Sequence, residues 1–384
     1  MTALEISSPV GAGMAPLAMY GIDPVTGFAP SEDPLDRLPA EFDAWERVVP
    51  IMAPLIRSRR LRSTLRAMPI LEVANLRGER EQERALLLLT VFANAWVWGG
   101  ECADLTIPAT ISTPLCALAG ALDRPPIVHY GSMALRNWRR VDRTLPLSAD
   151  NVQMAITFLG GVDEEWFFLA SLGCELAGAP LLPILRDLVV ASQNTDEASL
   201  TRLLDDAAQG MSPVLQALER MREWCDPYVF YNRVRNFVTG WPEPGVVYEG
   251  VWTEPRRYTG GSAGQSSLIQ AIDAALGVLH DGVVTGPFFR EMRTYMPREH
   301  RRFVEDLAAF SCVRDRVARG GPDLRAAYNR ALDVVVRFRA AHRAMAHDYV
   351  TAPSGMVPDE KGTGGTTLAQ FLDDARYETQ RNAL

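Results

Sequence analysis

The stretch Gly260-Gly261-Ser262-Ala263-Gly264 fits G-x-S-x-G, the pattern that presents a nucleophilic serine in α/β-hydrolases. That chemistry requires a strand before the serine and a helix after it, inside a parallel sheet. A helix is predicted after the motif, but strands do not alternate with helices anywhere along the chain. The motif is therefore weak evidence for a hydrolase, and its glycines can equally form a tight turn into the next helix.

A second candidate for chemistry is a histidine on the apolar face of a predicted helix. Residues spaced by three and four positions form this face: Tyr328, Leu332, Val335, Phe338, His342, Met345 and Tyr349. A lone histidine in such a stripe is usually a hydrogen-bonded core residue. No second histidine or carboxylate follows His342 at i+3 or i+4, which excludes H-E-x-x-H and di-iron patterns. If His342 binds a metal, haem suits it, because the porphyrin supplies four nitrogen ligands. His347, five residues on, falls nearer the polar face.

Composition excludes several classes of protein. The chain has 384 residues, 47% of them hydrophobic, and a formal charge of −8, so it lacks the basic footprint of a nucleic-acid binder. The most apolar run, at 85–100, is interrupted by Thr90 and Asn94 and predicts a buried core helix rather than a membrane span. The N-terminus lacks the pattern of a signal peptide. Five cysteines without C-x-x-C spacing indicate free thiols in a reducing cytoplasm.

The periodicity of the chain predicts an all-α fold. Residues 1–40 predict an irregular arm, and 246–251 a short β segment. Helices are expected at 35–56, 59–68, 80–98, 112–122, 130–138, 149–159 (with Ser148 as N-cap), 164–179, 182–193, 197–225, 227–238, 266–279, 300–318, 322–349 and 368–381. A glycine-rich loop is expected before the last of them.

Several segments together resemble the indoleamine 2,3-dioxygenase family, haem enzymes that open the indole ring of tryptophan. They are, in order, YGIDPVTGFAP, AWVWG, PPIVHY, NWRR, FFLASL, FYNRVRNFVTGW, VYEGVW, GGSAGQSS, MRTYMPREHRRF, RFRAAH and GTGGTTLAQFL. Each segment is weak evidence alone, but their number, order and spacing over nearly the whole chain are specific. The resemblance implies two helical domains. A small domain at 1–150 would line the distal pocket and cap a large haem-binding domain at 151–384.

The resemblance assigns roles by position. For the cofactor, His342 matches the proximal haem ligand, Arg339 an arginine near a haem propionate, and Asp273 an acid associated with haem retention. Gly261, Ser262 and Ala263 match the loop over the distal haem face. For the substrate, Phe167 and Ser171 match distal residues, and Tyr130 a pocket tyrosine. Phe230 matches the phenylalanine against the indole, Arg235 the arginine that binds the carboxylate, and Thr363 the mobile loop over the substrate.

Two positions depart from the vertebrate pattern. Met133 stands where those enzymes have a pocket cysteine, and Tyr231 stands where they have a second phenylalanine. The hydroxyl of Tyr231 needs a partner if it is buried. Both departures alter the expected pocket walls, so the preference among indoles stays open.

The resemblance implies that ferrous haem b and O₂ convert L-tryptophan to N-formylkynurenine. A reductant must first make the iron ferrous, and no side-chain base is demanded, since Ser171 is too weak a base to act unaided. A cytoplasmic monomer with no nucleic-acid or membrane partner is expected. Two alternatives stay open: the same chemistry on a modified indole, and an O₂-binding, myoglobin-like member. Arg235 and Thr363 argue against the second, because an oxygen carrier needs no clamp for an amino acid.

Overall fold

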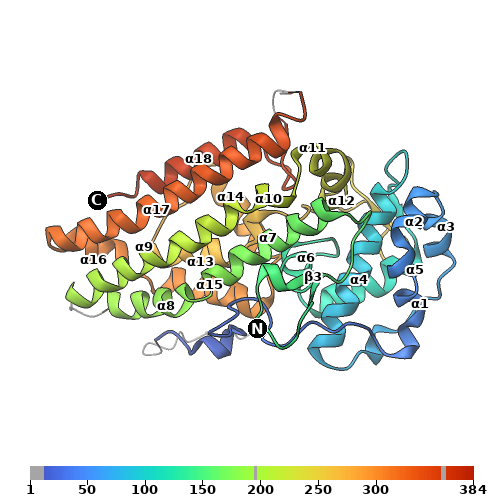
Figure 1. The fold of residues 1–384 in the computed structure, drawn as a ribbon, viewed down its shortest axis with the longest axis horizontal. Helices are drawn as coiled ribbons and strands as arrows, with labels where there is room; N and C mark the ends of the chain where they lie inside the picture. Colours follow the sequence, from blue (N-terminus) through green and yellow to red (C-terminus); the bar gives the residue numbers. More distant parts are fainter. Residues whose placement is uncertain (1–12, 194–196, 356–359) are drawn as a thin grey trace, which may run out of the picture.

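The computed structural model describes residues 13–193, 197–355 and 360–384, and it is mostly helical, as predicted (Figure 1). The first 12 residues of the predicted arm and residues 356–359 of the predicted glycine-rich loop lie outside the described residues. The helices of the first 150 residues gather toward one end of the molecule: α1 (Asp43–Glu46), α2 (Met52–Arg57), α3 (Leu61–Arg66), α4 (Gly78–Trp98), α5 (Ala109–Ala121) and α6 (Tyr130–Met133).

Helices that follow residue 160 form the other end. They include α7 (Val162–Gly178), α8 (Leu181–Ser192), α9 (Glu197–Glu219), α13 (Ser267–Leu276), α14 (Thr285–Arg293), α15 (Arg298–Phe310), α16 (Val313–Arg319), α17 (Pro322–Ala346) and α18 (Leu368–Gln380). Helix α9 packs against both α7 and α17, and α17 packs against α18 (Figure 1). Between α9 and α13 lie α10 (Met221–Trp224), α11 (Pro227–Val229), the π-helical turn η6 (Phe230–Val234) and α12 (Arg235–Val238).

Strand structure is confined to two small pairs in the described part of the chain. Strand β1 (Thr106–Ile107) pairs in parallel with β4 (Val247–Tyr248), which confirms the β segment expected near 246–251. Strand β2 (Trp138–Arg140) pairs antiparallel with β3 (Val152–Met154). The α/β-hydrolase alternative is therefore wrong, because its sheet is not formed by the described residues.

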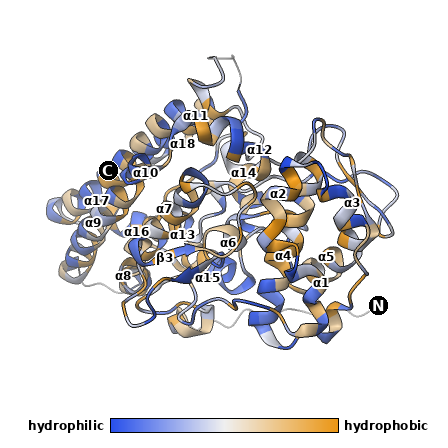
Figure 2. Ribbon diagram, turned by 45° about the vertical axis from the view of Figure 1, so that its right-hand side comes forward, coloured by the Kyte–Doolittle hydropathy of each residue, from blue (hydrophilic) through white to orange (hydrophobic). Residues whose placement is uncertain are grey.

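Helix α4 is the buried core helix that the apolar run predicted. Every residue from Glu83 to Val97 is buried, and Figure 2 shows the helix hydrophobic over much of its length. Its polar residues are satisfied: Thr90 Oγ1 donates to Leu86 O over 2.8 Å, and Asn94 Nδ2 donates to Phe237 O over 2.9 Å. Asn94 Oδ1 also accepts from Val128 N at 3.1 Å. The amide thus joins α4 to α12 and to the segment before α6, which compensates for its burial.

We compared the length and hydropathy of each helix with those needed to span a membrane. No single helix in the described ranges meets both requirements, and α7 and α8, bent by 45° at their junction, meet them only together.

Helix α17 confirms the predicted stripe. Its apolar members and Tyr349, just beyond it, are buried, whereas His347 is exposed. The helix ends in a second π-helical turn, η8 (His347–Thr351). Helix α17 also alternates in hydropathy in Figure 2, as expected for a helix with one apolar face.

Several predicted helices are wrong in extent or type. The helix expected at 300–318 is two helices, α15 and α16, separated at Ser311 and Cys312. The helix expected at 35–56 is broken into 3₁₀ turns, α1 and α2, because Pro39, Pro50 and Pro54 supply no backbone N–H. Only the first turn of the helix expected at 130–138 forms, as α6, before β2 begins at Trp138.

The helix expected at 149–159 is replaced by a 3₁₀ turn and β3, and Ser148 makes no side-chain cap. Here the backbone donors have tertiary partners: the carboxylate of Glu164 accepts from the N–H groups of Phe158, Leu159 and Gly160. These bonds replace those of a helix. Helix α14, whose first turn contains Gly286-Pro287, was not predicted. The proline lies in the first turn, where no N–H is needed.

Candidate active site

A large, mostly apolar cavity lies where α7, α17, α18 and the segment around α6 meet. The non-atom space counted for it is about 1800 Å³, a figure that includes open solvent at its mouth. Among the predicted site residues, the cavity is lined by Tyr130, Met133, Phe167, Ser171, Phe230, Gly261, Ser262, Ala263, Arg339, His342 and Thr363. The fold therefore brings together residues that are more than 200 positions apart in the sequence.

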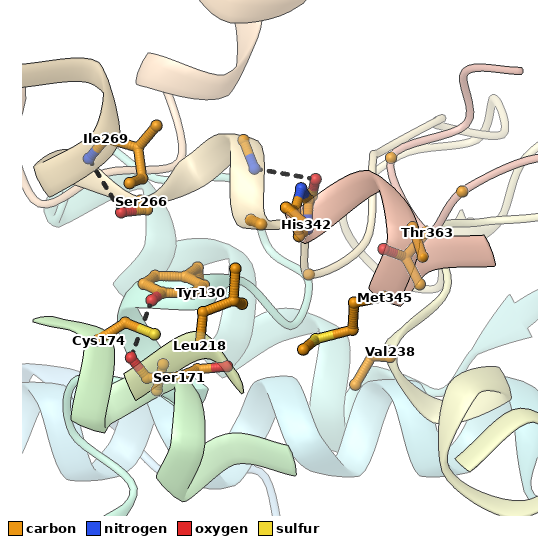
Figure 3. Close-up of a pocket in the computed structure, with 18 of the residues that line it drawn as sticks. Tyr130, Ser171, Cys174, Leu218, Val238, Ser266, Ile269, His342, Met345 and Thr363 are labelled. Carbon is orange, nitrogen blue, oxygen red and sulfur yellow. Dashed lines mark hydrogen bonds between the residues drawn. The ribbon is translucent and has the colours of Figure 1, made fainter. Parts of the chain in front are cut away.

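His342 extends from α17 into this cavity (Figure 3). Within the described residues, neither imidazole nitrogen has a hydrogen-bond partner. Burial, and secondarily the charge of Arg339, lower the pKa of His342 to about 4. The ring is therefore neutral at neutral pH, which is the form that binds a metal. His129, the other histidine in the lining, is engaged with Ser132, whose Oγ lies 2.9 Å from Nε2.

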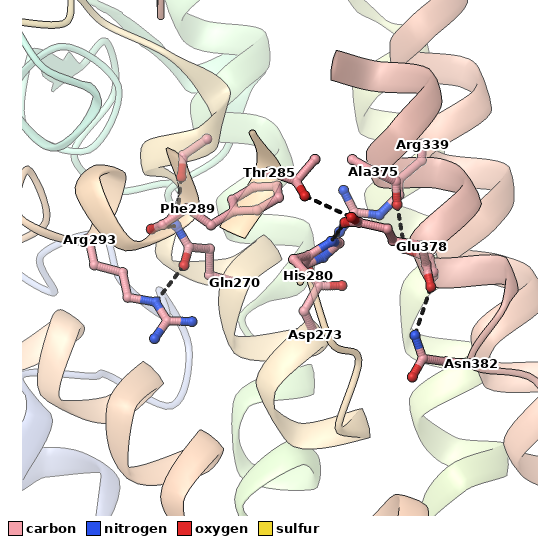
Figure 4. Close-up of polar contacts among 12 residues, drawn as sticks. Gln270, Asp273, His280, Thr285, Phe289, Arg293, Arg339, Ala375, Glu378 and Asn382 are labelled. Carbon is pink, nitrogen blue, oxygen red and sulfur yellow. Dashed lines mark hydrogen bonds and ion pairs between the residues drawn. The ribbon is translucent and has the colours of Figure 1, made fainter. Parts of the chain in front are cut away.

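Arg339, one turn before His342, belongs to a buried polar network (Figure 4). Its Nη2 donates to Asp273 Oδ2. His280 Nε2 lies 3.2 Å from the same oxygen, and His280 Nδ1 lies 2.7 Å from Glu378 Oε2 on α18. Burial alone would raise the pKa of Asp273, but Arg339 and His280 hold it at about 2. Asp273 is thus paired, as a carboxylate in an apolar stretch requires, and it supports Arg339 from behind rather than lining the cavity.

The glycines of the G-x-S-x-G motif serve close packing. A Cβ on Gly260 would lie 2.1 Å from Val238 O and 2.5 Å from Gly240 N, so two backbones meet here without room for a side chain. Ser262 Oγ accepts a hydrogen bond from Gly264 N at 3.2 Å and caps a 3₁₀ turn (Ala263–Gln265). In the part of the chain that the structure describes, no histidine hydrogen-bonds to Ser262, and nothing activates it as a nucleophile.

Aromatic side chains form the wall near η6. The rings of Phe167 and Phe230 lie 4.4 Å apart between centroids, and Tyr349 packs edge-on against Phe230 at 5.9 Å. The π-helical turn gives Phe230 this position, since such a turn shifts side chains relative to an α-helix and is frequent at functional sites. A flat aromatic ligand would find a fitting wall here.

Ser171 and Tyr130 lie together in the cavity lining (Figure 3). Tyr130 donates its phenolic proton to Ser171 O over 3.3 Å, and Ser171 Oγ donates to Phe167 O over 3.0 Å. The serine proton is thus already engaged within its own helix. This arrangement agrees with the expectation that Ser171 does not act as a base.

Glu175 is a lining residue that the sequence did not single out. Its Oε1 accepts a hydrogen bond of 2.6 Å from Ser266 Oγ, and its Oε2 is buried with no partner among the described residues. Burial raises the pKa of Glu175 to about 7. The spacing could have predicted that Glu175 lines the cavity, because Glu175 lies one turn after Ser171 on the same apolar face of α7.

Glu175→Gln is expected to remove a pH dependence of stability. A carboxyl whose folded pKa lies near 7, against 4.5 in the unfolded chain, destabilises the fold as pH rises between these values, by up to about 3 kcal/mol. Glutamine cannot ionise, so the variant should not lose this stability. The difference in free energy of unfolding, variant minus wild type, should therefore be larger at pH 8 than at pH 4. Urea unfolding at both pH values measures this. Glu219→Gln, at an exposed site, is the control and should behave as wild type. The prediction would be contradicted if the free energy of unfolding changed equally with pH in Glu175→Gln and in wild type.

Arg235 and Tyr231 do not line the cavity. Arg235 Nη2 lies 2.9 Å from Glu360 Oε1 and also donates to Lys361 O, so the expected carboxylate clamp is turned toward the segment before Thr363. The Tyr231 hydroxyl has the partner that its burial requires, since it donates to Glu360 Oε1 over 3.4 Å. Thr363 does line the cavity, and its carbonyl accepts from Gly260 N at 3.3 Å.

The residues of the cavity fit a haem. The free imidazole of His342 is a suitable axial ligand, and Arg339 lies on the same wall with its Nε buried and unpartnered among the described residues. A guanidinium there suits a propionate. The described residues hold no group of three or more histidine, cysteine or carboxylate side chains able to bind a metal ion. A single histidine ligand therefore suits a metal whose other ligands come from its cofactor.

Comparison with known proteins agrees with this geometry. Residues 16–382 match the family model described as indoleamine 2,3-dioxygenase. The chain is 34% identical to indoleamine 2,3-dioxygenase 1 of Mus musculus, covering 100% of this chain and 99% of the relative. It is 33% identical to indoleamine 2,3-dioxygenase nanC of Aspergillus nanangensis, over 94% and 96%, and 31% identical to indoleamine 2,3-dioxygenase of Saccharomyces cerevisiae, over 96% and 93%. The chain belongs to the indoleamine 2,3-dioxygenase family and is a dioxygenase of that type.

Proposed function

We propose that the protein uses haem b to add both atoms of O₂ across the indole C2–C3 bond of L-tryptophan, giving N-formylkynurenine. The observation that carries this proposal is the partner-free His342 imidazole in a cavity that also presents an aromatic wall, Phe167 and Phe230. Haem held by His342 would supply the activation of O₂. The net reaction consumes no external electron, so a reductant is needed only to bring the iron to its ferrous state.

The residues of the chain then act on the substrate. Phe167 and Phe230 hold the indole by stacking and keep water out. Arg235 binds the substrate carboxylate through a charge-assisted pair, and the backbone around Thr363 covers the site. The Ser171 hydroxyl donates its hydrogen bond to Phe167 O and removes no proton from the substrate. The backbone carbonyl of Ser171 orients Tyr130 by accepting from its hydroxyl.

A second candidate is the same reaction on a modified indole. Met133 lines the cavity, so the wall differs from the vertebrate pattern at this position, and Tyr231 stands beside Arg235 outside the lining. Within the same proposal, the chain is a cytoplasmic monomer whose residues 1–150 cap a haem-binding domain at 151–384. It has no nucleic-acid or membrane partner.

An anaerobic spectrum of the haem-loaded, dithionite-reduced protein tests the proposal. After O₂ and L-tryptophan are added, we expect a Soret band and N-formylkynurenine, identified by mass, in equal amount to the O₂ consumed. Turnover of substituted indoles alone would favour the second candidate, and stable oxygenated haem without any product would favour an oxygen-binding protein. Absence of a Soret band after haem addition would contradict the proposal.

A further inference from the structure

The guanidinium proposed to bind the substrate carboxylate already holds a carboxylate of its own chain. Arg235 Nη2 lies 2.9 Å from Glu360 Oε1, and the two side chains are 12% and 18% exposed. The same oxygen accepts from the Tyr231 hydroxyl, and Arg235 Cζ lies 5.2 Å from the centre of the Tyr231 ring. One oxygen of the largely buried Glu360 side chain therefore accepts from both Arg235 and Tyr231.

The segment that carries Glu360 has a defined shape. Leu368 N donates to Glu360 O over 3.0 Å, Lys361 and Thr367 form an antiparallel bridge, and Gly362 N donates to Thr366 O over 2.9 Å. Residues within this turn, Gly362 to Gly364, line the cavity. The carboxylate on Arg235 is thus fixed to the backbone that borders the proposed substrate site.

We propose that Glu360 is a specificity-determining residue that competes with the substrate carboxylate for Arg235. The inference rests on the proposed function, in which Arg235 is the carboxylate clamp. A guanidinium fork matches one carboxylate in bidentate geometry. Glu360 engages Arg235 through Nη2 alone, and Arg235 Nε is buried without a partner among the described residues. A ligand carboxylate that takes the fork in bidentate geometry must displace Glu360 from Nη2, so its affinity is lowered by the strength of the Arg235–Glu360 pair. A ligand without a carboxylate leaves the Arg235–Glu360 pair intact, so the pair does not lower its affinity.

Glu360→Gln isolates this competition. Glutamine has nearly the same shape and can still accept from Arg235, but it removes the charge, so the variant should fold with an unchanged Soret band and circular dichroism spectrum. We expect the affinity for L-tryptophan to rise by about 5- to 30-fold, because loss of a charge-assisted bond weakens the internal competitor. Asp374→Asn is the matched control: it removes an acid of helix α18 whose carboxylate accepts from Gln370, at 2.7 Å.

The experiment is a calorimetric titration of haem-loaded wild type, Glu360→Gln and Asp374→Asn. The ligands are L-tryptophan and a pair that differs by a carboxylate, indole-3-propionate and 3-methylindole. Glu360→Gln should tighten L-tryptophan and indole-3-propionate, leave 3-methylindole unchanged, and have no effect in an Arg235→Gln background.

The outcomes separate the two proposals. Turnover of L-tryptophan with unchanged or weaker binding of both carboxylates in Glu360→Gln would overturn the competition and leave the proposed function intact. Tighter binding of indole-3-propionate without turnover of L-tryptophan would support the competition and contradict the proposed function. Equal tightening of 3-methylindole would also overturn the inference, because that ligand has no carboxylate to compete.

Discussion

His342→Gln is expected to purify without a Soret band and to lose more than about 100-fold in dioxygenase activity. Residues that merely support a metal ligand cost about 10- to 100-fold when replaced, so loss of the ligand itself should exceed that range. No neighbour can substitute in place: His129 in the same lining is engaged with Ser132, and His280 is held between Asp273 and Glu378. Absorbance of the haem-reconstituted variant and initial rates with L-tryptophan measure both effects.

His347→Gln is the matched control for this result. His347 lies five residues later in the chain, is exposed and is not among the residues that line the cavity. It should keep both the Soret band and the activity of the wild type. A normal Soret band and normal turnover in His342→Gln would show that another group binds the iron, and would contradict the assignment of His342.

Arg235→Gln should raise the KM for L-tryptophan by about 10- to 100-fold, with a smaller change in kcat. The range corresponds to loss of a charge-assisted hydrogen bond of about 1.5–3 kcal/mol. Arg235→Lys should fall between wild type and glutamine, because it keeps the charge and loses the planar fork. Steady-state kinetics with L-tryptophan measures these changes.

Arg233 provides the control for Arg235. It lies on the same turn of chain but is exposed, so Arg233→Gln should leave the KM unchanged. Since Glu360 contacts Arg235 in this structure, part of the Arg235→Gln effect could arise from the released Glu360 carboxylate. The Arg235→Gln, Glu360→Gln double variant measures that part. A wild-type KM in Arg235→Gln would contradict the carboxylate clamp.

Periodicity predicted the elements that hold the proposed cofactor site, because their patterns are long. The stripe on α17 and the apolar run of α4 each fix one buried face over several turns, and the structure confirms both. The segment 149–159 is short, and its backbone partners come from elsewhere. Glu164 and Asn137 take its N–H groups, and β2 pairs with β3, so local pattern could not distinguish strand from helix.

The polar partners of the site could not be derived from spacing. His280 and Glu378 are 98 residues apart, and Tyr231 and Glu360 are 129 apart. Such pairs depend on how helices pack, not on any motif. The resemblance assigned roles to Asp273 and Arg235, but it did not reveal that His280 ties Asp273 to α18, or that Glu360 occupies Arg235.

The position of α18 has a consequence for biosynthesis. Leu368, Phe371, Leu372 and Ala375 of this helix complete a cavity whose other side is built by Tyr130 and its neighbours, more than 230 residues earlier. A ribosome that has not yet released α18 holds a nascent chain with an open, water-filled apolar basin. A prosthetic group captured by that chain would exchange freely. If the proposed haem binds in this cavity, we expect its stable loading to follow translation of this helix, because α18 supplies part of the lining.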